Sequence, residues 1–400
     1  MDSLPPVVRR YWPLAVVALL FGLYGWALVA ATGMGHDGAI GPRFNALGAD
    51  WVIFLAAARA FFTHDLAHIY NQLWITQATN SQFAHWLSTP LPFPLFPYPP
   101  VFLLLVLPFA GLPVGWSLLA SQLAQFTALA WALRRFAPDK SYLFFLIGAL
   151  LAPAAANNVL AGSNAVLVAA LIVGGAALLQ DRPVLAGALL GVVIFKPQFF
   201  PLLPLALIAA RQGRALTGIA ASVIALCLPS AALFGPALWL DWINVYLHPQ
   251  AVAGVNGTDW GHIWDESIST CMSLLGAPRW AGTAAQAAGL LVAVIAVWRT
   301  FRTAHPQRLA VLLCACLLAS PHVSNYDLEL LAIAALLAVQ AMPESSRPLA
   351  LMLPLGAWIA PLYNPPRALP LGLVTPLVIL ALLAGLLGGF GGQKPLPAKG

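Results

Sequence analysis

Long apolar stretches, separated by short polar ones, constrain this chain more than any other feature of its sequence. A helix needs about 20 apolar residues to cross a bilayer. Only 8% of the 400 residues are charged, against about 25% in soluble domains. We therefore expect one all-α polytopic membrane domain over residues 1–400, with about 12 transmembrane helices and a range of about 11 to 13. The predicted spans are 11–32, 115–134, 141–157, 163–180, 183–195, 198–210, 215–234, 283–299, 307–320, 326–342, 348–363 and 368–390.

Two long polar stretches, residues 33–98 and 235–282, interrupt the apolar segments and predict two large folded loops. Loops rich in lysine and arginine stay in the cytoplasm, and Arg9 and Arg10 assign the N-terminus to that side. The other basic clusters agree if the short run 100–113, broken by Pro108, does not cross the membrane. We then expect both termini in the cytoplasm of a bacterial inner (plasma) membrane, and both loops at the periplasmic face.

The net charge of +6 follows from the same bias of basic residues toward cytoplasmic loops. It does not indicate a nucleic-acid partner. Most acids and histidines fall on the predicted periplasmic side, so any chemistry is expected there.

Lys196 is out of place in this pattern, because it stands inside the apolar stretch "GALLGVVIFKPQFFPLLPLALIAARQ", residues 187–212. A lysine at the bilayer centre costs roughly 2.5–3.5 kcal/mol. One interpretation is a lysine that reaches the membrane interface with its ammonium group. The other is a cation held for an anionic ligand such as a lipid phosphate.

Several polar segments share the predicted periplasmic side with Lys196. Asp50 precedes an apolar helix over 51–62, where an N-cap is an ordinary role for aspartate. Arg59 lies on the opposite face of that helix, so no direct pair with Asp50 is implied. "PAAANNVLAGSNAVL" predicts a turn between spans, and "SPHVSNYDLELL" places His322 at a helix start. Together they offer a carboxylate that could act as a general base and cations that could stabilise a departing phosphate.

These segments, together with "GADWVIFLAAARAFFTHDLAHIY", "FPYPPVFLLLVLPFAGLP" and "RPVLAGALLGVVIFKPQ", resemble glycosyltransferase family 87 of the GT-C superfamily. The similarity runs in order from about residue 48 to residue 340. That family contains polyprenyl-phosphate-mannose-dependent α-1,2-mannosyltransferases. The resemblance implies a GT-C-type fold whose two large loops carry short helices. It also implies an inverting transfer of a sugar, by default mannose, from a polyprenyl-phosphate-linked donor to a lipid or glycan acceptor.

The resemblance also implies roles for individual residues. Asp50 matches the catalytic base, and His322 matches an active-site histidine. Lys196 and Arg59, with His322, would bind the donor phosphate. The candidates for binding the sugar or the acceptor are Tyr98, Asn157, Asn158, Asn164, Gln198, Asp259, Trp260, His262, Asn325 and Tyr326. The family's turn reads Gly-Gln-x-Asn, whereas this chain has Gly162-Ser163-Asn164-Ala165, which is a departure beside Asn164.

A monophosphate leaving group that faces fixed cations needs no divalent metal, so we expect no metal site and no other cofactor. The acids of the second loop leave a site for a divalent cation as an alternative; they are Asp259, Asp265 and Glu266. Two other functions also remain open. A lipid-linked sugar transporter or flippase would place its ionisable groups at the membrane midplane, and a non-catalytic scaffold for envelope assembly would need none of this chemistry.

Overall fold

The computed structural model describes residues 4–33, 47–87, 89–91, 94–247, 265–362 and 374–388. In these ranges the chain is helical and forms no β-strand, although one isolated antiparallel bridge joins Asp265 to Ser324. The prediction of an all-α membrane protein is confirmed at this level. The predicted residues Asp259, Trp260 and His262 lie outside the described ranges.

The first half of the chain contains the elements that build the first loop and the centre of the molecule. They are α1 Pro6–Arg10, α2 Trp12–Gly33, α3 Ala49–Arg59, η1 Leu66–His68, α4 Gln72–Gln82, α5 Val101–Val106, η2 Leu107–Phe109, α6 Val114–Phe136, α7 Ser141–Leu150, α8 Pro153–Ala161, α9 Ala165–Leu178, α10 Pro183–Val192 and η3 Val193–Phe195.

The second half adds further long and short apolar helices. They are α11 Leu202–Ala209, α12 Gly213–Phe234, α13 Pro236–Leu247, α15 Ile268–Leu274, α16 Arg279–Arg302, α17 Arg308–Ala319, α18 Glu329–Ala341, α19 Pro348–Ile359, η5 Ala360–Leu362 and α20 Val374–Gly388.

Among the described residues, α12 and α16 are long and apolar enough to cross a membrane. Two bent pairs qualify if each is counted as one span: α5 and η2 with α6, bent by 119°, and α7 with α8, bent by 48°. The first bend falls where the sequence predicts a run, 100–113, that does not continue into the next span. Further apolar helical segments of 10–17 residues lie in the same described ranges, Trp12–Ala27 of α2 among them, and the number of about 12 spans stays a prediction.

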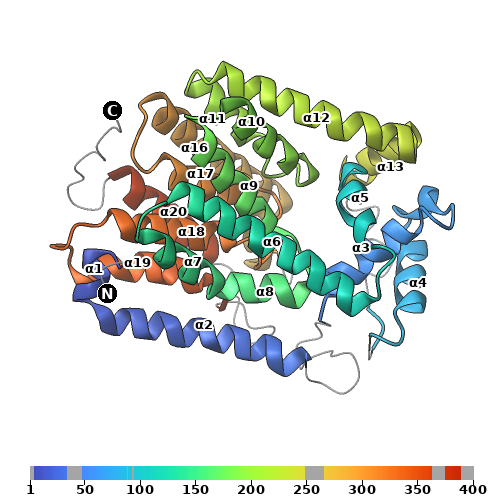
Figure 1. The fold of residues 1–400 in the computed structure, drawn as a ribbon, viewed down its shortest axis with the longest axis horizontal. Coiled ribbons are helices and arrows are strands. Elements are labelled where there is room, and N and C mark those ends of the chain that lie inside the picture. The colour runs from blue at the N-terminus through green and yellow to red at the C-terminus, as the bar shows by residue number, and fades with distance from the viewer. Residues whose placement is uncertain are drawn as a thin grey trace.

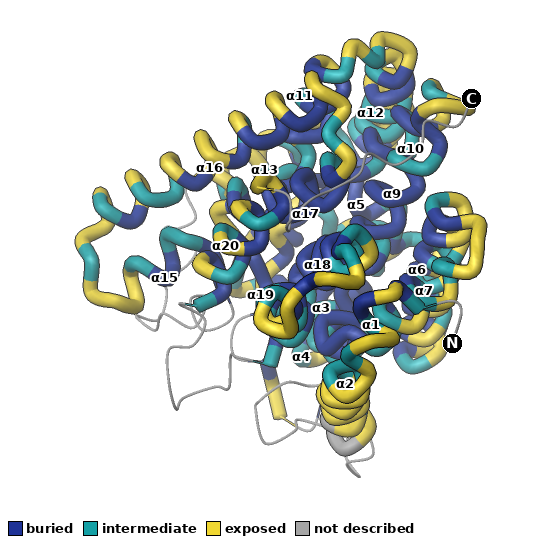
Figure 2. The backbone as a smooth tube through the Cα atoms, turned by 90° about the vertical axis from the view of Figure 1, so that its left-hand side faces the viewer, coloured by how far each residue is buried: buried dark blue, intermediate teal, exposed yellow. Residues whose placement is uncertain are grey.

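Helices at the periphery expose apolar side chains, whereas those at the centre bury theirs (Figures 1 and 2). α2, α12 and α16 expose Leu20, Leu228 and Leu291 respectively, as helices facing lipid do. α17 and α18 are buried along nearly their whole length. The polar site described below lies where the ends of central helices meet the first loop.

Small residues let α10 approach α12 closely and so fix the helix that leads to Lys196. A Cβ atom on Gly187 would lie 1.8 Å from the carbonyl oxygen of Ala215, and one on Gly218 would lie 2.0 Å from that of Val184. Close backbone contact of this kind is a common way for helices to associate in membranes. It holds α10, the helix that leads into η3 and Lys196, against α12.

Candidate active site

Two glycines bring the first loop against the turn between α8 and α9. Gly48 (φ 73°) and Gly162 (φ 69°) both adopt the left-handed conformation that suits glycine. The amide of Gly48 donates to the carbonyl of Leu160 at 2.7 Å. A Cβ atom on Gly162 would lie 2.9 Å from the Cα atom of Gly48 and 2.6 Å from the Cβ of Trp51. Asp50 is thereby placed beside Ser163.

The predicted N-cap role of Asp50 is wrong, because α3 begins at Ala49 and its N-cap is Gly48. Asp50 therefore lies in the first helical turn, where the free amide groups and the helix dipole favour a negative charge. Its side chain is half-buried. Burial raises the pKa of Asp50 to about 6, against the opposing effects of the Tyr326 hydroxyl, the charge of Lys196 and the Ser163 hydroxyl.

Lys196 forms a buried ion pair with Asp327. Its Nζ atom lies 2.5 Å from Oδ1 of Asp327, and both side chains are only 2% exposed. The ammonium group also lies 5.2 Å from the ring centroid of Tyr326 and 5.7 Å from that of Phe199. This corrects the interpretation of Lys196 as an interfacial lysine, because its charge is balanced inside the protein rather than by water.

Asp327 is also bonded to its own turn, since its Oδ2 atom accepts from the amide of Ser324 at 3.1 Å. The carboxylate thus ties the lysine to the segment that carries Tyr326 and His322. The sequence places His322 at a helix start and begins the next predicted span at residue 326. Both starts are too early, because α18 begins only at Glu329.

Aromatic stacking connects the first loop to the segment that carries Lys196. The ring centroids of Tyr98 and Phe102 lie 4.1 Å apart, and those of Phe102 and Phe195 lie 5.5 Å apart. The hydroxyl of Tyr70 donates to the carbonyl of Tyr98 at 2.7 Å. This stack fixes the position of the Tyr98 hydroxyl, which lies 3.0 Å from Nδ2 of Asn164.

His322 pairs with Asp265 at the accessible side of this cluster. Its Nδ1 atom lies 3.1 Å from Oδ2 of Asp265, and the side chains are 53% and 9% exposed respectively. Burial alone would lower the pKa of His322, but the hydrogen bond and negative charge of Asp265 outweigh it and raise that pKa. The carboxyl of Asp265 also accepts from the amides of Ser267 and Val323 and from the Thr270 hydroxyl.

The pKa of Asp265 reflects the same contacts. Burial would raise it, but the hydrogen bond and charge of His322 and the two backbone amides together lower it. Asp265 is therefore a carboxylate that favours the imidazolium form of His322. No group of three or more histidine, cysteine, aspartate or glutamate residues in the described part of the chain could hold a metal ion.

The predicted site residues fall into two groups. Asp50, Tyr98, Asn164, Lys196, His322 and Tyr326 influence one another electrostatically or by direct contact. Arg59 is held elsewhere: its guanidinium donates to the carbonyls of Ala110 and Leu112 and lies 5.0 Å from the ring centroid of Phe83.

The remaining predicted residues lie in helix α8 or in the turns next to Lys196 and Asp327. Asn157 and Asn158 lie in helix α8, not in a turn as predicted. Asn158 is buried and holds the α8–α9 turn, whereas Asn157 is half-buried. Gln198 and Asn325 are half-buried in the turns that follow Lys196 and precede Asp327.

Sequence reasoning missed the site's most direct contacts. It singled out neither Asp327 as the partner of Lys196 nor Asp265 as the partner of His322, and it gave Ser163 no role. It also missed Gln122 and Gln125, two buried amides on one face of α6 that donate to the carbonyl of Ser163. Two glutamines one turn apart in an apolar helix are the signal that could have drawn attention to them.

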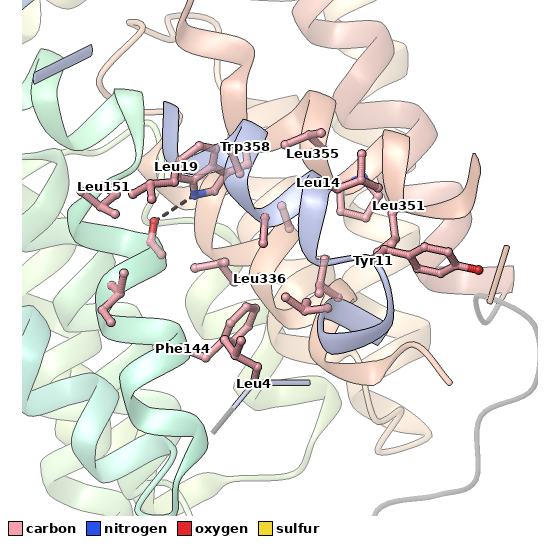
Figure 3. A pocket seen from close by; sticks show the side chains of 18 of the residues that line it. Leu4, Tyr11, Leu14, Leu19, Phe144, Leu151, Leu336, Leu351, Leu355 and Trp358 are labelled. Atoms are coloured by element: carbon pink, nitrogen blue, oxygen red, sulfur yellow. Dashed lines mark hydrogen bonds between the residues drawn. The ribbon is translucent and has the colours of Figure 1, made fainter. Parts of the chain in front are cut away.

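A cavity of about 320 Å³ lies apart from these residues, between α1, α2, α7, α18 and α19 (Figure 3). Its wall is apolar and includes Leu19, Phe144, Leu336, Leu351 and Trp358. The indole Nε1 of Trp358 donates to the carbonyl of Gly148 at 2.9 Å. None of the predicted site residues lines it.

Comparisons with known proteins identify the family of the chain. Residues 96–321 match the family model of glycosyltransferase family 87, which is more than half of the chain. The match includes Tyr98, Ser163, Asn164, Lys196 and Asp265; it ends one residue before His322 and begins after Asp50. No curated protein and no solved structure gives a significant match. The chain belongs to glycosyltransferase family 87.

Proposed function

We propose that this glycosyltransferase moves a sugar from a polyprenyl-phosphate-linked donor to a hydroxyl group of a lipid or glycan acceptor, with inversion at the anomeric carbon. One observation carries the proposal. A half-buried carboxyl group whose pKa is raised to about 6, Asp50, shares a cluster with an exposed histidine that is paired with a carboxylate. These are the properties of a general base and of a cation for a leaving group.

The proposed step is a single displacement. The ionised carboxylate of Asp50 takes the proton of the acceptor hydroxyl as its oxygen attacks the anomeric carbon. The bond from that carbon to the phosphate oxygen breaks on the opposite side, and its electron pair stays on the phosphate. The products are the glycoside and the polyprenyl phosphate.

His322 is the group we assign to the departing phosphate, because its imidazole is 53% exposed and Asp265 favours its protonated form. Lys196 acts at a distance: its charge lowers the pKa of Asp50, while its contact with Asp327 holds the turn that carries Tyr326. We assign no catalytic part to Arg59, whose guanidinium is bonded to the carbonyls of Ala110 and Leu112.

The finer assignments rest on sequence patterns. Mannose is the sugar implied by the resemblance to polyprenyl-phosphate-mannose enzymes. The distribution of basic residues favours a periplasmic site in a bacterial inner membrane. A transporter or flippase is the alternative, and it would require Lys196 to become accessible from both sides.

The test is sugar transfer by the purified protein in detergent, with short-chain polyprenyl-phosphate mannose and an extracted lipid pool. Asp50→Asn should lower turnover by about 10²–10⁴-fold, the contribution of a general base. It should also stabilise the folded protein at pH 8 by about 1–3 kcal/mol, since a carboxyl with a raised pKa opposes folding when ionised. Transfer that survives Asp50→Asn would contradict the assigned base. Wild-type protein without transfer from any lipid-phosphate sugar would favour the flippase or scaffold.

The pH dependence of transfer separates the two assigned groups. The rate should rise with pH through about 6 as Asp50 ionises, and fall at higher pH as His322, whose pKa is raised above its ordinary value, loses its proton. His322→Gln should remove the fall at high pH and keep the rise at low pH. A profile unchanged in shape by His322→Gln would exclude this histidine as the titrating cation.

A further inference from the structure

The apolar cavity of about 320 Å³ lies where α2 separates from α7. At one end of the cavity the two helices meet closely at Gly22. A Cβ atom on Gly22 would lie 2.5 Å from the carbonyl oxygen of Leu151 and 3.2 Å from the indole of Trp358, and both of these residues line the cavity. Toward the N-terminus of α2 the cavity lies between the two helices, and the residues of α2 that line it there are Leu14, Ala15, Ala18 and Leu19.

The cavity opens sideways, between α2 and α7 (Figure 3). Leu19 of α2 and Leu143 and Ile147 of α7 line it and are also 42%, 50% and 53% exposed, whereas Leu336 and Trp358 are buried. Apolar cavities of this kind stay free of water, and exposed apolar faces at the periphery of a membrane bundle contact lipid. The chemistry of the opening therefore fits a hydrocarbon chain from the bilayer.

Arginine side chains gather at the end of the cavity that α1 covers. The guanidinium of Arg10 lies 5.4 Å from the ring centroid of Tyr11, a lining residue, and donates to the carbonyl of Glu344 at 3.1 Å. The hydroxyl of Tyr11 donates, at 3.1 Å, to the backbone carbonyl directly before Arg347. Both arginines are exposed, as is Arg9. Three positive charges against the one of Glu344 make this end complementary to an anion.

An apolar cavity open to the bilayer and a basic rim together fit a phospholipid with an anionic headgroup. Basic pockets between helices on the cytoplasmic side bind such headgroups, and the basic residues predict that this end is cytoplasmic. We propose that the cavity holds an acyl chain of an anionic phospholipid of the cytoplasmic leaflet, whose phosphate lies against Arg9, Arg10 and Arg347. The lipid fills the gap between α2 and α7 and holds α1 and α2 on the bundle. The inference does not depend on the proposed reaction.

This lipid is distinct from the sugar donor. The donor phosphate is assigned to His322, which precedes α18, whereas Leu336 and Val339 in the second half of α18 line the cavity. The ten residues from Glu329 to Val339 extend over ~15 Å of helix. The two phosphates therefore lie toward opposite ends of α18.

The experiment measures the unfolding temperature of the purified protein in a neutral detergent, with phospholipid added to the micelles. Dioleoyl phosphatidylglycerol should raise the temperature clearly, and dioleoyl phosphatidylcholine, which has the same chains and no net charge, should raise it much less. Inorganic phosphate should have no effect, because it has no chain to fill the cavity. Polyprenyl phosphate is a separate arm, since it carries the leaving group of the proposed donor.

Two arginines of the rim test the headgroup. Arg9→Gln/Arg10→Gln should increase about 30-fold the concentration of phosphatidylglycerol needed for half of the rise. Any rise with polyprenyl phosphate should be unchanged in this variant. The matched control is Arg299→Gln/Arg302→Gln, which removes two exposed arginines from the last turn of α16 and should respond as wild type does.

A larger side chain in the cavity tests the acyl chain. Ala15→Leu should keep the unfolding temperature of the lipid-free protein, or raise it, and lose most of the response to phosphatidylglycerol, because the added carbon atoms occupy the cavity. Ala288→Leu adds the same atoms on the exposed face of α16 and should keep the response.

Three results would overturn the inference. One is an equal rise with phosphatidylcholine and phosphatidylglycerol, or no rise with either. Another is a wild-type response in both Arg9→Gln/Arg10→Gln and Ala15→Leu. The third is a rise with polyprenyl phosphate that matches phosphatidylglycerol and is lost in both variants, which would assign the cavity to the donor. None of these measurements uses sugar transfer, so each outcome leaves the test of the proposed function separate.

Discussion

Two ion pairs of the candidate site, Lys196–Asp327 and His322–Asp265, have the same kind of charges and opposite surroundings. Lys196 and Asp327 are each 2% exposed and lie 2.5 Å apart. His322 is 53% exposed and lies 3.1 Å from an Asp265 that is 9% exposed. The first pair is enclosed by Tyr326 and Phe199, whereas the second faces outward on its histidine side.

Under the proposed function, this difference separates a positioning role for Lys196 from a chemical role for His322. A buried ion pair is costly to break, since removing one partner leaves an uncompensated charge away from water. It therefore holds Tyr326 and the turn before α18 in one place. In the other pair, His322–Asp265, called the half-open pair below, the exposed imidazole can exchange a proton and contact a ligand. The carboxylate of Asp265 favours the protonated form of that imidazole. Lys196, which stands out in the sequence, is thus the enclosed cation, and His322 is the accessible one.

The largest expected effect comes from breaking the enclosed pair. Lys196→Met should destabilise the protein by about 3–5 kcal/mol and abolish transfer, as measured by thermal unfolding in detergent and by the transfer assay. The double variant Lys196→Met/Asp327→Asn should recover most of the stability, because no net charge is then buried and the introduced asparagine can still accept from the amide of Ser324. A double variant as unstable as the single one would show that the charge balance is not what matters.

Breaking the half-open pair, His322–Asp265, should affect activity more than stability. His322→Gln should lower turnover by about tenfold to a hundredfold, less than a fully enclosed donor would cost. It should change the unfolding free energy by less than about 1 kcal/mol, since the histidine is half exposed and its charge is screened by solvent. If His322→Gln destabilised the protein as strongly as Lys196→Met, the two pairs would have the same structural role.

The stability of the half-open pair should depend on pH in a defined window. Asp265, whose pKa is lowered, contributes above its unfolded pKa of about 3.8 and loses the contribution as pH falls through its folded pKa. His322, whose pKa is raised, contributes fully below about 6.5 and loses it as pH rises through its folded pKa. The difference in unfolding temperature between wild type and His322→Gln should therefore be greatest near pH 5 and shrink toward pH 8.

The smallest effect is expected from a third pair, Arg135–Asp181, which is exposed on both sides. Its atoms lie 3.3 Å apart and its side chains are 44% and 69% exposed. Arg135→Gln should change the unfolding free energy by no more than about 0.5 kcal/mol and leave transfer unchanged. A larger loss of stability would mean that the contribution of an ion pair to stability depends on the distance between its charged atoms rather than on its burial.

The all-helical class and the family could be predicted from the sequence, whereas the roles of the site residues stay predictions. Hydrophobic patterning is local, so it indicated an all-helical membrane protein, and the order of short motifs indicated the family. The same motifs selected Asp50, Lys196 and His322 before any contact was known. Helix boundaries were less predictable: Asp50 lies inside α3, and Tyr326 precedes α18, because capping glycines and turns decide where a helix begins.

The sequence by itself determined the residue types that could do the chemistry. A lysine in an apolar stretch, or a histidine after a serine-proline pair, can be recognised without any knowledge of the fold. Only the tertiary structure decided their partners. Asp327 lies 131 residues from Lys196, and Val323, beside His322, bonds Asp265 from 58 residues away. Such pairs depend on how the ends of separate helices are packed. Hydropathy records whether a residue is buried, but it carries no information about which buried charge another residue will face.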